Sequence, residues 1–122
     1  MGTIKRFEDI EAWQKARELV NDIYDLTSKG DFARDYSLRD QIRRAAVSVM
    51  LNIAEGFGRK TDKEFARFLV QSHGSAAEVQ SVLYIAMDQK YIVRDKFDYL
   101  YNKAGEISKM INSLSQYLSK RQ

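Results

Sequence analysis

The 122-residue sequence contains no cysteine and no proline, and each absence narrows the structures that it can form. Without cysteine there can be no disulfide framework, thiolate metal site or cysteine nucleophile, and a reducing cytoplasm suits this composition. No apolar run approaches the roughly 18 residues that cross a bilayer. The first residues also lack the apolar region of a secretion signal. We therefore expect a soluble, cytoplasmic protein without a membrane partner.

The remaining composition is that of an ordinary globular protein. Hydrophobic residues make up 44% of the chain and charged residues 30%, which argues against wholesale disorder. A chain of this length can bury roughly two thirds of the surface that it exposes when unfolded. No linker or low-complexity segment divides it. We expect a single domain over residues 1–122.

Apolar residues recur at helical spacing along the whole chain, and no proline interrupts them. This predicts an all-α, antiparallel up-down-up-down four-helix bundle. Ser37 is expected to cap the second helix, and Thr61 with Glu64 matches a capping box at the start of the third. The expected helices lie near residues 8–27, 37–56, 62–90 and 94–119. The last has the most regular core stripe: Phe97, Leu100, Ala104, Ile107, Ile111, Leu114 and Leu118.

The expected second helix is apolar over about two thirds of its circumference, more than one face of a bundle helix requires. Its core stripe consists of Ile42, Ala45, Ala46, Val49 and Ile53. A second apolar surface consists of Val47, Met50, Leu51 and Ala54. This surface is either the outside of a tightly packed helix or a subunit interface. We favour the interface and predict a homo-oligomer, in which tyrosines of the fourth helix could also make contact.

A narrow polar stripe follows the same helix, and the third helix has one with the same spacing. The stripes are Gln41, Arg44, Ser48, Asn52, Glu55 and Glu64, Arg67, Gln71, Ser75, Glu78. In an antiparallel hairpin their members lie at matching heights, Gln41 with Glu78 and Arg44 with Ser75. We predict that Asn52 and Glu55 bond to the third helix or the intervening turn, and Arg44 to Glu78. The alternative is two separate solvated faces, since the pattern does not show whether the stripes converge.

Positive charge is concentrated around the second and third helices. Residues 39–67 contain seven Lys and Arg against four Asp and Glu, whereas the rest of the chain has thirteen of each. Such a group can contact nucleic-acid phosphates, although no base-reading motif accompanies it. An ordinary solvated surface is the alternative. The candidate phosphate contacts are Arg39, Arg43, Arg59, Lys60, Lys63 and Arg67.

Little in the sequence points to catalysis. His73 is the only histidine, and the Glu-x-x-His pattern of di-iron bundles is missing. The segment GFGRKT at residues 56–61 lacks the Walker spacing and follows a helix, not a strand. We expect no catalytic residue, no bound metal and no cofactor.

Several segments carry a family resemblance. FEDIEAWQKARELV, DQIRRAAVSVMLNIAEGFGR, EFARFLVQSHGSAAEV and the YI at residues 91–92 resemble the four-helix-bundle proteins encoded within bacterial 23S rRNA intervening sequences. The resemblance implies a small cytoplasmic bundle and favours a homopentamer. It also implies an architecture similar to the accessory proteins of diversity-generating retroelements, which bind nucleic acid and a reverse transcriptase. Where the family commonly has proline, this chain has Met50, which predicts a straighter helix.

Two classes of function therefore remain. One is a non-catalytic oligomer that binds RNA or DNA phosphates with little sequence preference. The other is a protein–protein assembly module or adaptor that binds no nucleic acid. They differ in their response to salt, which weakens phosphate binding steeply but not an apolar protein contact.

Overall fold

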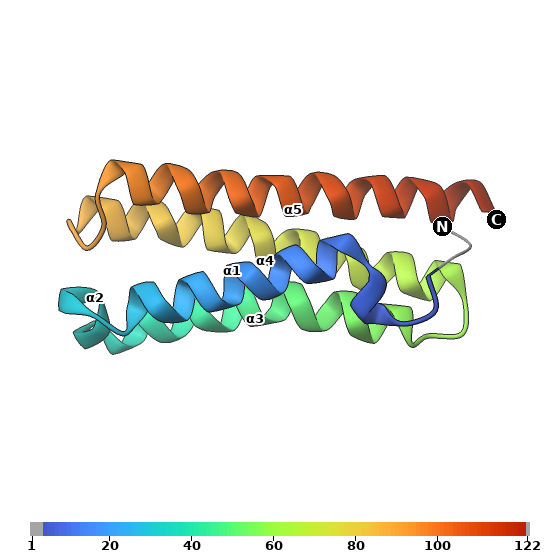
Figure 1. Cartoon of the computed structure of the whole chain (residues 1–122), viewed down its shortest axis with the longest axis horizontal. Helices are drawn as coiled ribbons and strands as arrows, with labels where there is room; N and C mark the ends of the chain where they lie inside the picture. Colours follow the sequence, from blue (N-terminus) through green and yellow to red (C-terminus); the bar gives the residue numbers. More distant parts are fainter. Residues whose placement is uncertain (1–3, 122) are drawn as a thin grey trace.

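The computed structural model describes residues 4–121. A short 3-10 turn, η1 (Phe7–Asp9), precedes the helices α1 (Glu11–Thr27), α2 (Gly30–Arg34), α3 (Tyr36–Phe57), α4 (Asp62–Asp88) and α5 (Arg94–Arg121). The four long helices pack side by side in an elongated bundle (Figure 1). The prediction of an all-α helical bundle is confirmed. Within residues 4–121, no helix is both long and apolar enough to span a membrane.

Successive long helices run in opposite directions along the bundle (Figure 1). The main contacts join α3 to α4, α4 to α5, α1 to α3 and α1 to α5. The helices therefore occupy the corners of a square, with α3 and α4 on adjacent corners. Lys103 on α5 bonds to Asp22 on α1 at 3.0 Å, and Gln80 on α4 donates to the backbone oxygen of Tyr101 on α5 at 3.2 Å.

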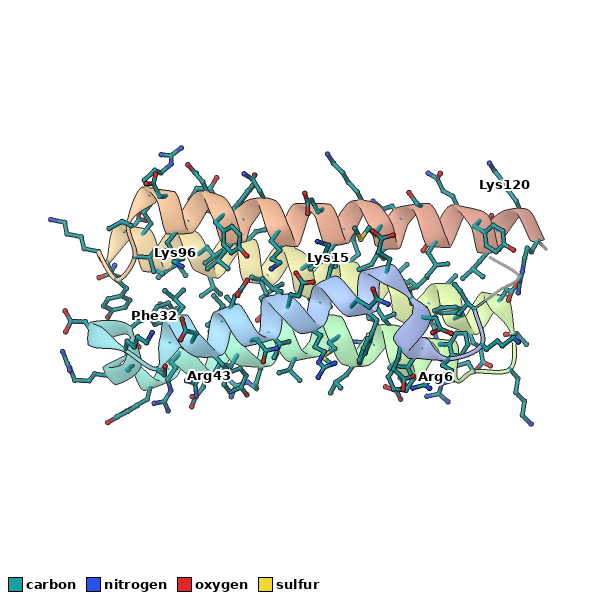
Figure 2. The ribbon with its side chains drawn as sticks, in the orientation of Figure 1. Arg6, Lys15, Phe32, Arg43, Lys96 and Lys120 are labelled. Atoms are coloured by element: carbon teal, nitrogen blue, oxygen red, sulfur yellow. The ribbon has the colours of Figure 1, made fainter. Side chains whose placement is uncertain are left out.

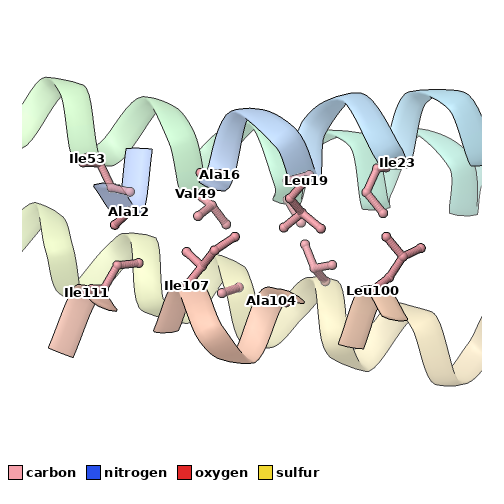
Figure 3. Packing of buried hydrophobic residues seen from close by; sticks show 14 of the residues in the cluster. Ala12, Ala16, Leu19, Ile23, Val49, Ile53, Leu100, Ala104, Ile107 and Ile111 are labelled. Atoms are coloured by element: carbon pink, nitrogen blue, oxygen red, sulfur yellow. The ribbon is translucent and has the colours of Figure 1, made fainter. Parts of the chain in front are cut away.

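The core forms where the apolar stripes of the four helices meet. Figure 3 shows Leu19 and Ile23 of α1 pointing inward toward the layer that contains Leu100 of α5. All residues of the predicted stripes on α3 and α5 are buried. Burial of large apolar side chains stabilises such a core by roughly 1.5–3 kcal/mol for each one.

The start of the first helix differs from the prediction. The expected helix at residues 8–27 is divided at Ile10, which has an extended backbone and a buried side chain. The Asp9 carboxylate accepts hydrogen bonds from the backbone N–H groups of Lys5 and Arg6. These bonds close a separate turn, so that α1 begins only at Glu11.

The segment between the first two expected helices also has a structure that was not predicted. It contains the short helix α2, which the chain enters through Gly30 at a φ of +62°, a conformation that glycine adopts without strain. The prediction of Ser37 as the α3 cap is wrong: Asp35 accepts from the Leu38 N–H at 3.1 Å. A carboxylate at this position also complements the positive end of the helix dipole.

The connection between α3 and α4 is short and tightly packed. A Cβ on Gly56 would lie 2.8 Å from the Cβ of Phe68, so the two helices approach closely there. The Thr61 hydroxyl accepts from the Glu64 N–H at 3.1 Å, which is one of the two bonds of the predicted capping box; within residues 4–121 the Glu64 side chain does not make the other. This packing holds the basic residues of the turn at one end of the bundle.

Candidate functional site

The six candidate phosphate contacts lie in two separate groups. Arg39 and Arg43 occupy the first turns of α3, at the α2 end of the bundle (Figure 2). The other four, here called the turn group, lie in the α3–α4 turn or in the first turns of α4, at the opposite end: Arg59, Lys60, Lys63 and Arg67. Because a helix rises 1.5 Å per residue, Arg43 and Arg59 are separated by about 25 Å along the bundle. One chain does not bring all six charges to one patch.

Arg39 and Arg43 already have partners within the chain. The Arg43 Nε donates to the Thr27 hydroxyl at 2.8 Å, and its guanidinium lies 4.5 Å from the centre of the Tyr24 ring. Arg39 donates to the Asp40 carboxylate at 3.0 Å and to the backbone oxygen of Ala33 on α2 at 3.1 Å. These two arginines therefore help to hold α1, α2 and α3 together.

The turn group contains two arginines that contact other side chains and two lysines that do not within the described chain. Arg59 pairs with Glu55 at 3.0 Å and lies over the Phe68 ring at 4.6 Å, and Arg67 approaches the same ring at 5.7 Å. The side chains of Lys60 and Lys63 are exposed. Neither side chain has an ion pair or hydrogen bond with any residue from 4 to 121. Their ammonium groups are available to a phosphate in solution.

A pocket of about 270 Å³ lies beside this turn, and it contains a residue that sequence reasoning missed. Arg121, in the last turn of α5, donates two 2.8 Å hydrogen bonds to the Asp62 carboxylate at the start of α4. These bonds lower the pKa of Asp62 below its usual range. Aromatic and basic side chains share the lining, which includes Phe57, Phe65, Tyr117, Arg59, Lys60 and Arg121.

The polar stripes of α3 and α4 converge on the outer side of the seam between these helices. The hydroxyls of Ser48 and Ser75 lie 2.8 Å apart, and Gln41 donates to Glu78 at 3.5 Å. The second pair has the predicted register. The first is displaced by one turn of α3 from the predicted register, in which Ser75 lies opposite Arg44.

Other members of the predicted polar network bond differently. Asn52 donates to the backbone oxygen and hydroxyl of Ser48 at 2.8 and 2.9 Å, so its predicted bond to α4 is wrong. Glu55 pairs with Arg59 of the turn at 3.0 Å, the kind of partner expected for it. Glu64 bonds to the Thr61 hydroxyl through its backbone N–H, and within residues 4–121 its side chain has no hydrogen bond or ion pair.

The predicted bond between Arg44 and Glu78 is also wrong. Within residues 4–121 Arg44 has no hydrogen bond or ion pair, and its side chain is exposed on the outer face of α3. Glu78 accepts only the bond from Gln41 among these residues. Both charges therefore remain on the surface at neighbouring heights.

The second apolar surface of α3 is only partly free. Met50 and Ala54 pack against the core, whereas Val47 is half-buried and Leu51 is 56% exposed. Leu51 and Val47 line a shallow groove of about 610 Å³ on the outer face of α3. Its remaining lining residues are Tyr24, Asp40, Arg43, Arg44, Ser48, Asn52 and Glu55.

His73 is half-buried in the middle of α4. Among residues 4–121 no group of three or more His, Cys, Asp or Glu side chains is close enough to hold a metal ion. The features that distinguish the surface are thus the turn group and the α3 groove.

The four packed long helices place the chain among the small helical-bundle proteins. The model of the 23S rRNA-intervening sequence protein family matches residues 8–113, and the chain belongs to this family. No curated protein matches the sequence.

A solved structure confirms the fold. It is the crystal structure of a protein of unknown function from the S23 ribosomal protein family of Bacteroides thetaiotaomicron VPI-5482, with a TM-score of 0.78 and 22% sequence identity. The match covers 85% of this chain and 97% of the other. At this identity the similarity concerns the fold alone.

Proposed function

We propose that the protein is a non-catalytic oligomer that binds RNA or DNA phosphates with low sequence specificity in the cytoplasm. The observation that carries this proposal is the pair Lys60 and Lys63, exposed and without in-chain partners among residues 4–121. Arg59 stands beside them, and the neighbouring pocket combines basic and aromatic side chains. Arg39, Arg43 and Arg59 contribute less, because each is bound to another residue of the chain.

Oligomerisation is part of the proposal because each chain offers few charges. Joining several copies adds weak phosphate contacts together and raises the affinity of the assembly without any new type of contact. The family resemblance favours a homopentamer. It also supports a reverse transcriptase as a protein partner, by analogy with bundles of similar architecture.

The binding test compares salt dependence between matched variants. Wild-type protein is titrated with a structured RNA across a range of salt concentrations, alongside Lys60→Gln/Lys63→Gln. The control is Lys90→Gln/Lys96→Gln, which removes two exposed lysines from the opposite end of the bundle. The turn variant should flatten the slope of log affinity against log salt by about one to two units per engaged chain. The control should retain the wild-type slope.

The α3 groove favours a second candidate, an assembly module or adaptor. A half-exposed leucine in a groove suits a protein contact, which would weaken little as salt rises. Failure of the wild-type protein to bind RNA at low salt, where electrostatic association is strongest, would make this the better account.

A further inference from the structure

Two outward faces on adjacent corners of the bundle have complementary chemistry. The outer face of α3 presents Arg44, Val47, Leu51 and Glu55, all of which line the groove. The outer face of α4 presents Arg67, Val70, Gly74 and Glu78, which are all exposed. Each face has an apolar centre with one positive and one negative residue at its ends. Both faces run from arginine to glutamate in the chain direction, so antiparallel pairing brings opposite charges level with each other.

The register between these faces follows from a hydrogen bond inside the chain. The Ser72 hydroxyl on α4 bonds to the Val49 carbonyl oxygen on α3 at 2.7 Å, which places these residues level along the bundle. Because α3 and α4 are antiparallel, two residues toward the C-terminus of α3 reach the same height as two residues toward the N-terminus of α4. Leu51 is therefore level with Val70. The same step in the other direction places Val47 level with Gly74.

The level pairs also match in size. Leu51 is 56% exposed and Val70 is 68% exposed, so both leave apolar surface in contact with water. A Cβ built on Gly74 would meet nothing within 4 Å, so no contact within the described chain requires a glycine at this position. Glycine inside a helix destabilises it relative to alanine. A helix of a second copy that brings Val47 against Gly74 would explain why a residue without a side chain stands at this position.

The charges at the ends of the two faces pair in the same register. Arg44 comes level with Glu78, and Glu55 with Arg67, each within about one residue rise of 1.5 Å. Arg44 has no partner within residues 4–121, whereas Glu55 also pairs with Arg59 at 3.0 Å and Glu78 also accepts a bond from Gln41. Both ends of the contact would thus join opposite charges.

We propose that the outer face of α4 from a second copy of this chain docks antiparallel in the α3 groove, with Leu51 against Val70, Val47 against Gly74 and Arg44 beside Glu78. This inference rests on the oligomer of the proposed function and identifies its contact. Rotation about an axis parallel to the bundle keeps every residue at its height, so the register inside one chain also applies between copies. The contact joins two different faces, and it forms a closed ring when the rotation between copies divides a full turn. In such a ring Arg67 serves the contact between copies and Lys60 and Lys63 are left for phosphates.

The first test measures solution mass by light scattering for wild type, Gly74→Leu and Val70→Glu. Gly74→Leu places a large side chain where the single chain has open space, so the helix should fold at least as well, by circular dichroism, while the assembly dissociates. The control is Val93→Glu, since Val93 is 71% exposed and lies outside both faces. It should keep the wild-type mass.

The second test exchanges the charges of one pair. Arg44→Glu and Glu78→Arg should each shift the assembly toward monomer at least tenfold in protein concentration, and the double variant should recover most of the loss. A wild-type oligomer whose mass is unaffected by Gly74→Leu, Val70→Glu and the charge reversals would overturn this contact and leave the proposed function standing. A wild type that is monomeric at micromolar concentration would overturn both.

Discussion

The Ser72 hydroxyl, buried on α4, donates a 2.7 Å hydrogen bond to the Val49 carbonyl oxygen on α3. A side chain this small lets the two helices lie close together, and its hydrogen bond satisfies a hydroxyl that has no access to water. The contact between Ser48 and Ser75 and the packing of Gly56 against Phe68 continue the same seam. Small residues therefore set the separation and the register of α3 and α4.

We expect Ser72→Ala to lower the free energy of unfolding by about 1 kcal/mol, because one buried hydrogen bond is lost. Ser72→Leu should lower the free energy of unfolding further, by about 1–3 kcal/mol, because the larger side chain forces the helices apart. Urea denaturation measures both changes. Ser113→Ala, at an exposed serine on α5, is the control and should be nearly neutral. Equal stabilities for Ser72→Ala and Ser113→Ala would mean that the seam bond contributes nothing.

A charge placed in the α5 core stripe should be severely destabilising. Leu114 is 6% exposed, and Leu114→Asp would bury a carboxylate without a partner, at a cost of about 3–5 kcal/mol. Ser113→Asp changes the exposed neighbour on the same helix and should have a small effect. Thermal denaturation followed by circular dichroism compares the two. If Leu114→Asp melts within a couple of degrees of wild type, our account of the α5 core face is wrong.

The hydrogen bond between Tyr91 and Asp35 should make stability depend on pH at the alkaline side. The Tyr91 hydroxyl donates to the Asp35 carboxylate at 2.9 Å, which raises the pKa of Tyr91 above its ordinary value. A raised pKa means that this contribution is complete below the pKa of the unfolded phenol. It is lost as the pH rises through the higher pKa of the folded chain.

We therefore expect Tyr91→Phe to be less stable than wild type at neutral pH, with the difference shrinking as Tyr91 ionises above its folded pKa. Urea denaturation over a series of alkaline pH values gives the comparison. Tyr36→Phe is the control, because Tyr36 is 64% exposed. A difference between Tyr91→Phe and wild type that stays constant through the alkaline range would contradict the proposed linkage.

The long helices could be predicted because their cores are periodic. Leu100, Ile107 and Ile111 repeat at the spacing that buries one face of a helix, and all three are buried. The start of α3 could not be predicted as readily, since Asp35 and Ser37 are both good caps in sequence. The structure selects Asp35, which also receives the Tyr91 hydroxyl from a distant part of the chain.

The surface features were less predictable than the core because they depend on how the helices rotate about their axes. Matching stripes on α3 and α4 predicted polar partners at similar heights. The pattern could not show that Asn52 would turn back to Ser48, or that Arg44 would remain exposed without a bond to residues 4–121. The place of Arg121 beside the turn depends on the length and register of α5, and no local motif marks it.

The two groups of basic residues should respond differently to substitution. Arg43 is held by the Thr27 hydroxyl and the Tyr24 ring, so its guanidinium is less free to move toward a phosphate. Lys60 has no such partner among residues 4–121. We expect Arg43→Gln to lower the free energy of unfolding by about 1 kcal/mol and to leave the salt slope of RNA binding unchanged.

Lys60→Gln should show the opposite behaviour: stability close to wild type, and a salt slope reduced by about one unit per engaged chain. Both variants lose a single positive charge, so a general effect of net charge on RNA affinity would reduce the two slopes equally. Urea denaturation and salt titrations on the same protein preparations separate these cases. Equal slope reductions would show that phosphate contact extends along α3 to Arg43 and is not concentrated at the turn.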